Sequence, residues 1–151
     1  MSASGTFLLP HAPSSVGVAR RLLGTDLRAH RVPEAAVADA TLVLSELMSN
    51  AIRHAHPLPG AQVRLCWKLA GRSLEIAVTD GGGQTKPYPV STPPSAVGGR
   101  GLSIVGRLAR RWGVRSDEQS TTVWAVLPAG PNSAVPRRAR RAPAGARQPA
   151  G

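Results

Sequence analysis

Residues 42–54 read LVLSELMSNAIRH, and this stretch decides the fold. Glu46, Asn50 and His54 follow one another at intervals of four, so in an α-helix they share one polar face. The apolar residues fall on the opposite face and predict a helix packed on a core: Leu44, Leu47, Met48, Ala51 and Ile52. Asn is mildly unfavourable inside a helix, which hints at another use. The alternative is an ordinary amphipathic helix whose polar face meets water.

The flanking sequence places this helix in an α+β chain. Pro33 opens the helix at residue 34, and Pro57 ends it near residue 54. The other predicted elements are an edge strand at 6–9, a helix from 14 or 15 to about 30, strands at 62–69 and 74–79, a helix from about 101 to 112, and a strand at 121–127. This order predicts helices on one face of a mostly antiparallel sheet, which is a two-layer α/β sandwich.

Composition limits the domain organisation. We expect one folded domain over residues 6–129, preceded by a flexible N-terminus at 1–5. Residues 130–151 are mainly Pro, Ala, Gly and Arg, so they predict a disordered tail that lacks the apolar side chains of a core. The formal net charge is +11, and the tail contributes five arginines without any acid. We interpret this charge as a soluble surface with a solvated basic tail.

Cysteine usage and hydropathy exclude some classes of protein. Cys66 is the single cysteine, so neither an intrachain disulfide nor a cysteine-based metal site is possible. No run approaches 18 apolar residues, and the N-terminus lacks the pattern of a signal peptide. The sequence therefore predicts a cytoplasmic protein with no membrane partner.

A glycine-rich corner ends the second strand of the predicted hairpin. Asp80 is followed directly by Gly81, Gly82 and Gly83. A carboxylate here can accept a hydrogen bond from an exocyclic amine, and the glycines let the backbone approach a flat ligand. The same residues also fit a plain turn in which Asp80 caps its own backbone. These residues alone leave both interpretations open.

A second glycine-rich segment, Gly98-Gly99-Arg100-Gly101-Leu102, leads into the third predicted helix. Free N–H groups at a helix N-terminus favour a phosphate, and Arg100 would add a charge-assisted contact. The spacing matches neither the dinucleotide fingerprint nor the P-loop. Residues 84–98 contain four prolines and form a long connection, which we expect to act as a lid.

In their order and spacing, these segments resemble the GHKL superfamily of ATPases, which share the Bergerat fold. The resemblance spans about residues 7–128 and rests on Glu46-x-x-x-Asn50-Ala51-x-x-His54, Asp80-x-Gly82, Gly99-x-Gly101-Leu102-x-Ile104-Val105 and Thr122-Val123-Trp124. It implies an ATP site that uses Mg²⁺.

The resemblance also implies roles for individual residues. Glu46 would be the general base, and Asn50 would hold Mg²⁺ through its amide oxygen. Asp80 would bind the adenine amino group, and Gly82 would let the base approach. Further ATP-binding positions are implied, with His54 either contacting the ligand or supporting the helix end: His54, Gly99, Arg100, Gly101, Leu102 and Thr122.

Within the superfamily, the pattern around Glu46 together with Trp112-Gly113-Val114 resembles the bacterial anti-sigma-factor serine/threonine kinases. That resemblance implies a homodimeric kinase that binds a sigma factor in one state. In another state it would phosphorylate a serine of a small antagonist protein, so its partners would be proteins and not specific nucleic acid.

Three positions depart from that pattern. Ser120-Thr121 stands where relatives often have Gly-Lys or Gly-Thr, Val97 stands where an acid is common, and Lys86 is the one charge in the predicted lid. A nucleotide-gated partner-binding module without kinase activity is therefore an alternative. A third possibility is a nucleic-acid-associated protein acting through its basic tail, although aromatic residues make up only 3% of the chain and offer few surfaces for base stacking.

Overall fold

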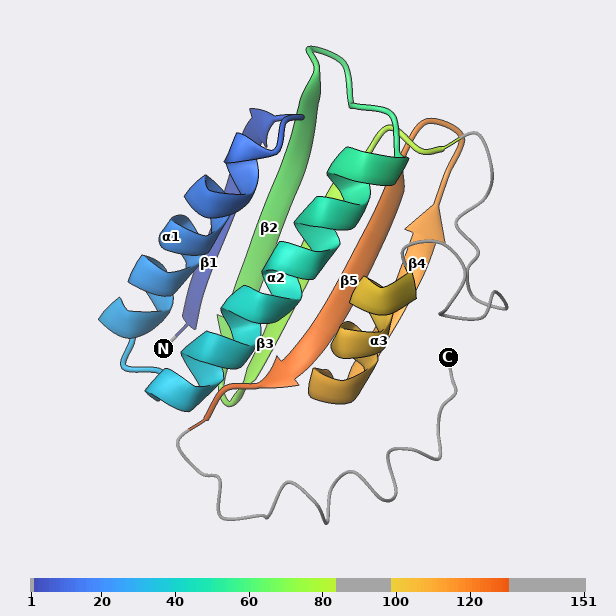
Figure 1. Cartoon of the computed structure of the whole chain (residues 1–151). Coiled ribbons are helices and arrows are strands. Elements are labelled where there is room, and N and C mark those ends of the chain that lie inside the picture. The colour runs from blue at the N-terminus through green and yellow to red at the C-terminus, as the bar shows by residue number, and fades with distance from the viewer. Residues whose placement is uncertain (1, 84–98, 131–151) are drawn as a thin grey trace.

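The computed structural model describes residues 2–83 and 99–130. Its elements are β1 (Ser2–Pro10), α1 (Ser14–Ala29), α2 (Glu34–His54), β2 (Gln62–Ala70), β3 (Ser73–Asp80), α3 (Gly99–Leu108), β4 (Arg111–Ser116) and β5 (Thr121–Pro128). The strands pair antiparallel in the spatial order β1-β2-β3-β5-β4. All three helices cover the same face of this sheet (Figure 1), so the predicted two-layer α+β sandwich is confirmed.

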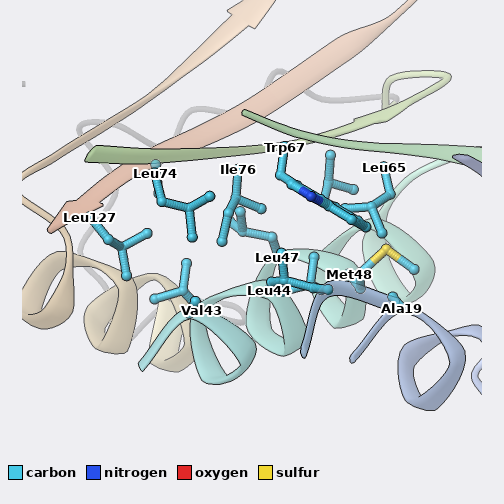
Figure 2. Packing of buried hydrophobic residues seen from close by; sticks show 14 of the residues in the cluster. Ala19, Val43, Leu44, Leu47, Met48, Leu65, Trp67, Leu74, Ile76 and Leu127 are labelled. Carbon is cyan, nitrogen blue, oxygen red and sulfur yellow. The ribbon is translucent and has the colours of Figure 1, made fainter. Parts of the chain in front are cut away.

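The core lies between α2 and the central strands (Figure 2). The buried face of α2 contributes Leu44, Leu47 and Met48, in agreement with the predicted apolar stripe, and also Val43, which the stripe did not include. The strands contribute a facing set of fully or almost fully buried side chains: Leu65, Trp67, Leu74, Ile76 and Leu127. Burial of each such side chain stabilises the fold by about 1.5–3 kcal/mol, so this layer holds the helices on the sheet.

The sheet has two chemically different faces because successive side chains of a strand alternate. In β3, Leu74, Ile76, Val78 and Asp80 point toward the helices and are buried. We call this side the helix face and the opposite side the open face. Asp80 therefore continues a row of core positions, although it is a carboxylic acid.

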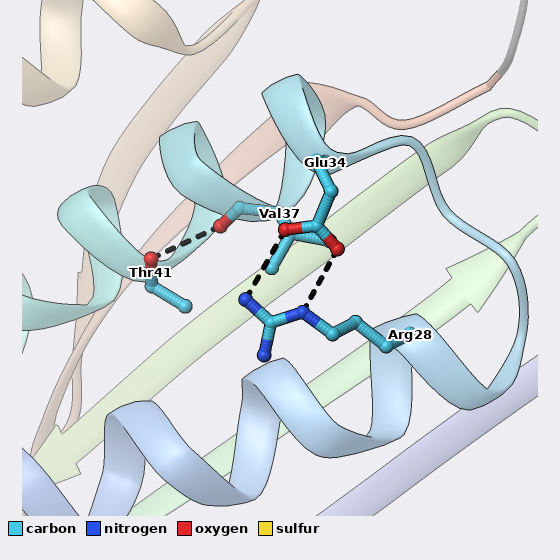
Figure 3. A network of polar contacts seen from close by, with 4 residues as sticks. All are labelled: Arg28, Glu34, Val37 and Thr41. Carbon is cyan, nitrogen blue, oxygen red and sulfur yellow. Dashed lines mark hydrogen bonds and ion pairs between the residues drawn. The ribbon is translucent and has the colours of Figure 1, made fainter.

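Polar contacts join the outer helix to its neighbours. The Arg28 guanidinium donates to both carboxylate oxygens of Glu34, at 2.9 and 3.2 Å, which links α1 to the start of α2 (Figure 3). Both side chains are exposed, so this pair adds little stability. Trp67 Nε1 donates to Asp26 Oδ2 over 2.7 Å and attaches α1 to β2. This bond provides the buried indole N–H with an acceptor.

The first strand begins earlier than predicted. The edge strand begins at Ser2 and not at Thr6, because β2 is nine residues long and offers backbone groups for pairing along its whole edge. The predicted tail at 130–151 lies, apart from Gly130, outside the described residues.

The chain after α3 corrects the predicted element order. We expected the third helix to reach about Trp112, but it runs from Gly99 to Leu108, and β4 follows at Arg111. Leu108 and Trp112 are four residues apart, so the helical spacing continues into a strand. Pairing with β5 satisfies the backbone there instead. The observed order is therefore β-α-α-β-β-α-β-β.

Among the described residues, α2 is the one helix that is long and apolar enough by composition to cross a membrane. Its apolar face packs on the sheet in the two-layer fold. Packing in the core thus accounts for its hydrophobicity.

Candidate functional site

Most of the residues predicted for the site come together at one end of the sheet. The C-terminal half of α2, the end of β3, the start of β5 and the N-terminal end of α3 lie at this end (Figure 1). These elements are far apart in the sequence. The antiparallel order β3-β5-β4 brings them together.

On α2, Glu46 and Asn50 lie one turn apart on the side that faces α3. Thr41 faces α1, where a Cβ added at Gly24 would lie 3.9 Å from the Thr41 methyl group, and Asn50 is nine residues further along, which is two and a half helical turns. Asn50 therefore lies on the side opposite α1, where α3 packs. Both Glu46 and Asn50 are half-buried, whereas His54 is exposed at the last position of the helix. A ligand between α2 and α3 would meet the first two residues.

Asp80 is the most unusual residue at this end. It is only 4% exposed, and its Oδ1 accepts a hydrogen bond from the Gly82 N–H over 2.7 Å. Its Oδ2 accepts none from the part of the chain that the structure describes. Burial raises the pKa of Asp80 to about 6, against the smaller opposing effects of the Gly82 bond and of His11 and His56. The site therefore holds a desolvated acceptor that lacks a donor.

The backbone after Asp80 is fixed by the loop that follows α2. Gly81 N donates to His56 O, and His56 N donates to Gly82 O, both over 2.8 Å. A Cβ on Gly81 would collide with the Pro57 carbonyl oxygen, and Gly82 has a φ of +87°. Both positions therefore require glycine. The corner predicted from the sequence thus combines both interpretations, a turn closed by Asp80 itself and a carboxylate with one oxygen to spare.

The two threonines at the start of β5 lie on different faces of the sheet. Thr121 pairs with Asp80 in the ladder, so both side chains lie on the helix face. Thr121 is buried, and its Oγ1 lies 3.2 Å from Ser116 Oγ. Thr122 lies on the open face, where its Oγ1 is 2.7 Å from that of Thr79. The structure thus places Thr121 beside Asp80, whereas the resemblance implied Thr122 as the ATP-binding threonine.

Two histidines near Asp80 were not singled out from the sequence. His11, just after β1, has its Nε2 3.0 Å from the Ala51 carbonyl oxygen of α2. His56 lies in the loop that pairs with Gly81 and Gly82. Both imidazoles favour the charged form of Asp80. Sequence offers little signal for such residues, because their approach depends on how β1 and the loop after α2 fold back on β3.

The predicted phosphate segment forms the start of α3. The helix begins at Gly99 and includes Arg100 and Gly101, and Leu102 in its first turn is half-buried. Backbone N–H groups at this end have no helical partner and can face an anion. Residues 84–98, the predicted lid, lie outside the described residues.

Comparisons with known proteins agree with the overall fold. A family model described as the histidine kinase-like ATPase domain matches residues 9–127. Among solved structures, the chain is similar to the crystal structure of the RsbU and RsbW domains of Rv1364c from Mycobacterium tuberculosis, with 15% identity and a TM-score of 0.65. That match covers 84% of this chain and 32% of the other, so this chain spans about a third of that structure. At this identity the likeness shows the fold alone. No curated protein matches the sequence.

Proposed function

Because the chain belongs to the histidine kinase-like ATPase domain family, we propose that it binds ATP with Mg²⁺ and phosphorylates a serine or threonine of a partner protein. The observation that carries ATP binding is Asp80 Oδ2, a buried acceptor without a donor among the described residues. The exocyclic amino group of adenine supplies such a donor, whereas guanine has a carbonyl oxygen at that position. Asp80 would therefore favour ATP over GTP.

The phosphates would lie between α2 and the first turn of α3. That turn provides backbone donors, and Asn50 provides an amide oxygen on the facing side of α2. Within the described residues, no three His, Cys, Asp or Glu side chains form a metal cluster. This fits Mg²⁺, which keeps several waters and takes phosphate oxygens as ligands, so that Asn50 needs to supply only one more.

Glu46 would orient the acceptor hydroxyl. It lies one turn before Asn50 on the same side of the helix, so a hydroxyl held by Glu46 would approach the phosphate end of the nucleotide. The hydroxyl oxygen forms a bond to the γ-phosphorus while the bond to the ADP oxygen breaks, and Glu46 accepts the hydroxyl proton. Such a transfer depends on position more than on covalent chemistry, and α2 is a rigid support for it.

The partners follow from the resemblance to anti-sigma-factor kinases. We propose that the phosphate acceptor is a small antagonist protein, that the alternate partner is a sigma factor, and that the active species is a homodimer. The pattern around Glu46 supports the kinase branch. The backbone N–H groups at the N-terminus of α3 would face the phosphates.

Replacing Glu46 with Gln tests the catalytic assignment. Glu46→Gln should bind Mg·ATP with an affinity within about threefold of wild type, because the carboxylate contacts the acceptor and not the nucleotide. Labelling of the antagonist by radioactive ATP should fall by 10²-fold or more, as for a lost general base. Glu118→Gln is the matched control, since it removes the same charge from the exposed β4–β5 turn and should label normally.

Three results would separate the possibilities. Equal labelling by wild type and Glu46→Gln would refute the role of Glu46. Tight ATP binding without labelling by either protein would favour the nucleotide-gated binding module. If calorimetry finds no ATP binding to the wild type, the proposed function fails entirely.

A further inference from the structure

The open face of the sheet has an ordered pattern of side chains. The helices all lie on the other face (Figure 1), and no described element covers this one. Antiparallel partners share a face, so outward-pointing residues of neighbouring strands align in rows across the sheet. The central row contains Cys66, Ala77 and Trp124, in β2, β3 and β5. It has no charge.

Basic side chains stand at four corners around this row. Arg64 and Lys68 lie four residues apart on β2, and Arg111 and Arg115 lie four residues apart on β4. All four are exposed. Two more strands separate β2 from β4, so the corners are about 14 Å apart across the sheet and about 13 Å apart along the strands. Glu75, opposite Lys68, is the one acid among the described residues of this face.

These four cations lack an ion-pair partner of the kind that Arg28 has. On the helix side, Arg28 is held by Glu34 in a two-bond ion pair (Figure 3). None of the corner residues forms an ion pair within residues 2–83 and 99–130. Arg115 instead lies over the Trp124 ring, with its guanidinium carbon 5.8 Å from the ring centroid. The corner charges therefore remain available for an anionic partner.

The centre of the face is apolar and only half-buried. Trp124, Ala77 and Cys66 each keep part of their surface exposed. The Trp124 indole lies flat over Gly113, where an added Cβ would come within 2.7 Å of the ring. A flat apolar strip framed by cations results, and burying it against a partner would be favourable.

We propose that the open face docks an amphipathic acidic helix of a partner protein. A helix is about 10–12 Å wide with its side chains, which fits between two basic rows about 13 Å apart. Lying across the strands, it would place its apolar stripe on Trp124, Ala77 and Cys66. Acids on both of its flanks would meet the corner cations. The distance from β2 to β4, about 14 Å, corresponds to about nine residues of helix, or two and a half turns.

Charge and geometry exclude the other candidate occupants. A second copy would bring four like charges against these four, and the C-terminal tail contains five arginines and no acid. A single nucleic-acid strand stacks its bases on several aromatic rings, whereas Trp124 is the one aromatic side chain on this face among the described strands. The surface thus lacks the free aromatic platforms that single strands need. The docking surface lies on the face of the sheet away from the ATP site and does not rest on the proposed function.

The test uses the full chain without nucleotide and a synthetic helical peptide of about 18 residues, with leucines at i, i+3, i+4 and i+7 spacing and glutamates on both flanks. Binding is measured by fluorescence anisotropy, and the contact face is mapped from amide chemical shifts. Arg64→Glu/Arg115→Glu reverses two corner charges. Arg21→Glu/Arg31→Glu is the matched control, because it makes the same charge change at exposed positions of α1 and the turn after it. Circular dichroism confirms that each variant folds.

We expect the peptide to bind wild type, the corner variant to lose at least tenfold in affinity, and the control variant to lose less than threefold. Shifts should be confined to β2, β3, β4 and β5, and a lysine version of the peptide should not bind. If the corner variant does not fold, Lys68→Gln/Arg111→Gln replaces it and should lose at least fivefold. Failure of the wild type to bind the peptide, or equal losses in both variants, would overturn the proposal. So would tighter binding of an 18-nucleotide DNA at the same corners, or self-association that the corner variant abolishes.

Discussion

Replacing Asp80 with Asn should make the protein more stable and less able to bind ATP. The substitution keeps the shape of the side chain and an oxygen that can accept the Gly82 N–H bond. It removes a negative charge from a position that is 4% exposed. Both effects have the same cause, because the buried carboxylate is poorly solvated as long as no ligand donates a hydrogen bond to it.

The size of the stability effect follows from the pKa of Asp80. Burial raises this pKa from 3.8 to about 6. Each pH unit between the folded and unfolded pKa corresponds to about 1.4 kcal/mol. Ionised Asp80 therefore destabilises the folded protein by about 3 kcal/mol at pH 7. Because the neutral amide also loses some hydration on burial, we expect Asp80→Asn to increase the free energy of unfolding by about 1–3 kcal/mol.

The pH dependence of stability tests separately whether ionised Asp80 destabilises the folded protein. A raised pKa means that the folded state holds the proton more tightly than the unfolded state does between pH 3.8 and about 6. Wild type should therefore gain stability as the pH falls through 6 toward 4, and lose it again as the pH rises. Asp80→Asn cannot gain in this way. The difference between the two proteins should be largest at pH 7 and above and vanish near pH 4.

Urea unfolding of both proteins at pH 4, 5, 6, 7 and 8 measures this difference, because other titrating groups cancel between them. The same samples are titrated with Mg·ATP by calorimetry at pH 7.5. Loss of a charge-assisted hydrogen bond corresponds to about 1.5–3 kcal/mol, so the affinity should fall by about 10- to 100-fold. If Asp80→Asn is less stable than wild type by the same amount at every pH, the carboxylate already has its partners. The argument for an unsatisfied acceptor then fails.

Three further predictions concern the same end of the sheet and its core. Gly81→Ala should destabilise the fold by about 1–3 kcal/mol in urea, because the methyl group meets the Pro57 carbonyl oxygen; Gly17→Ala, at the fourth residue of α1 where an added Cβ makes only an ordinary contact with the Arg21 side chain, should instead stabilise it by about 0.5–1 kcal/mol. Trp67→Phe should reduce the free energy of unfolding by about 1–2 kcal/mol, since the indole N–H loses its 2.7 Å bond to a carboxylate of α1; unchanged stability would show that water replaces this bond. Adenosine, which has no phosphate to titrate, should bind more weakly as the pH falls below 6, by up to about 10- to 100-fold, because protonated Asp80 loses the charge-assisted hydrogen bond to the base; an affinity that does not change between pH 5 and 7.5 would contradict this.

Most of the fold could be predicted from local patterns. The Pro33 and Pro57 boundaries of α2 and the hairpin of β2 and β3 agree with the structure, because periodicity and proline act over a few residues. The error at β4 has the same origin. Trp112 lies four residues after Leu108 and extends the helical spacing. Only the pairing with β5, which is non-local, makes that segment a strand.

The site shows a different limit of sequence reasoning. Asp80 and Asn50 could be chosen because each stands out in its own element. The choice between Thr121 and Thr122 depended on which face each one occupies. Strand alternation contained that information, since Ala125 and Leu127 are core positions of the same parity as Thr121. The approach of His11 to α2 had no comparable local signal.

The departures from ordinary packing rules argue for a functional site independently of any family. Buried acids are rare unless paired, yet Asp80 and the buried hydroxyl of Thr121 lie side by side. Gly81 leaves no room for a side chain, and Gly82 adopts a left-handed φ. The other two buried polar side chains, Ser15 and Thr79, each have a hydrogen-bond partner, and the rest of the described core is apolar. Sequences that fold well tend to break such rules mainly where function requires it. The buried carboxylate with an unused oxygen, next to a buried hydroxyl at one end of β3 and β5, therefore supports the proposal that stability is reduced here in exchange for binding.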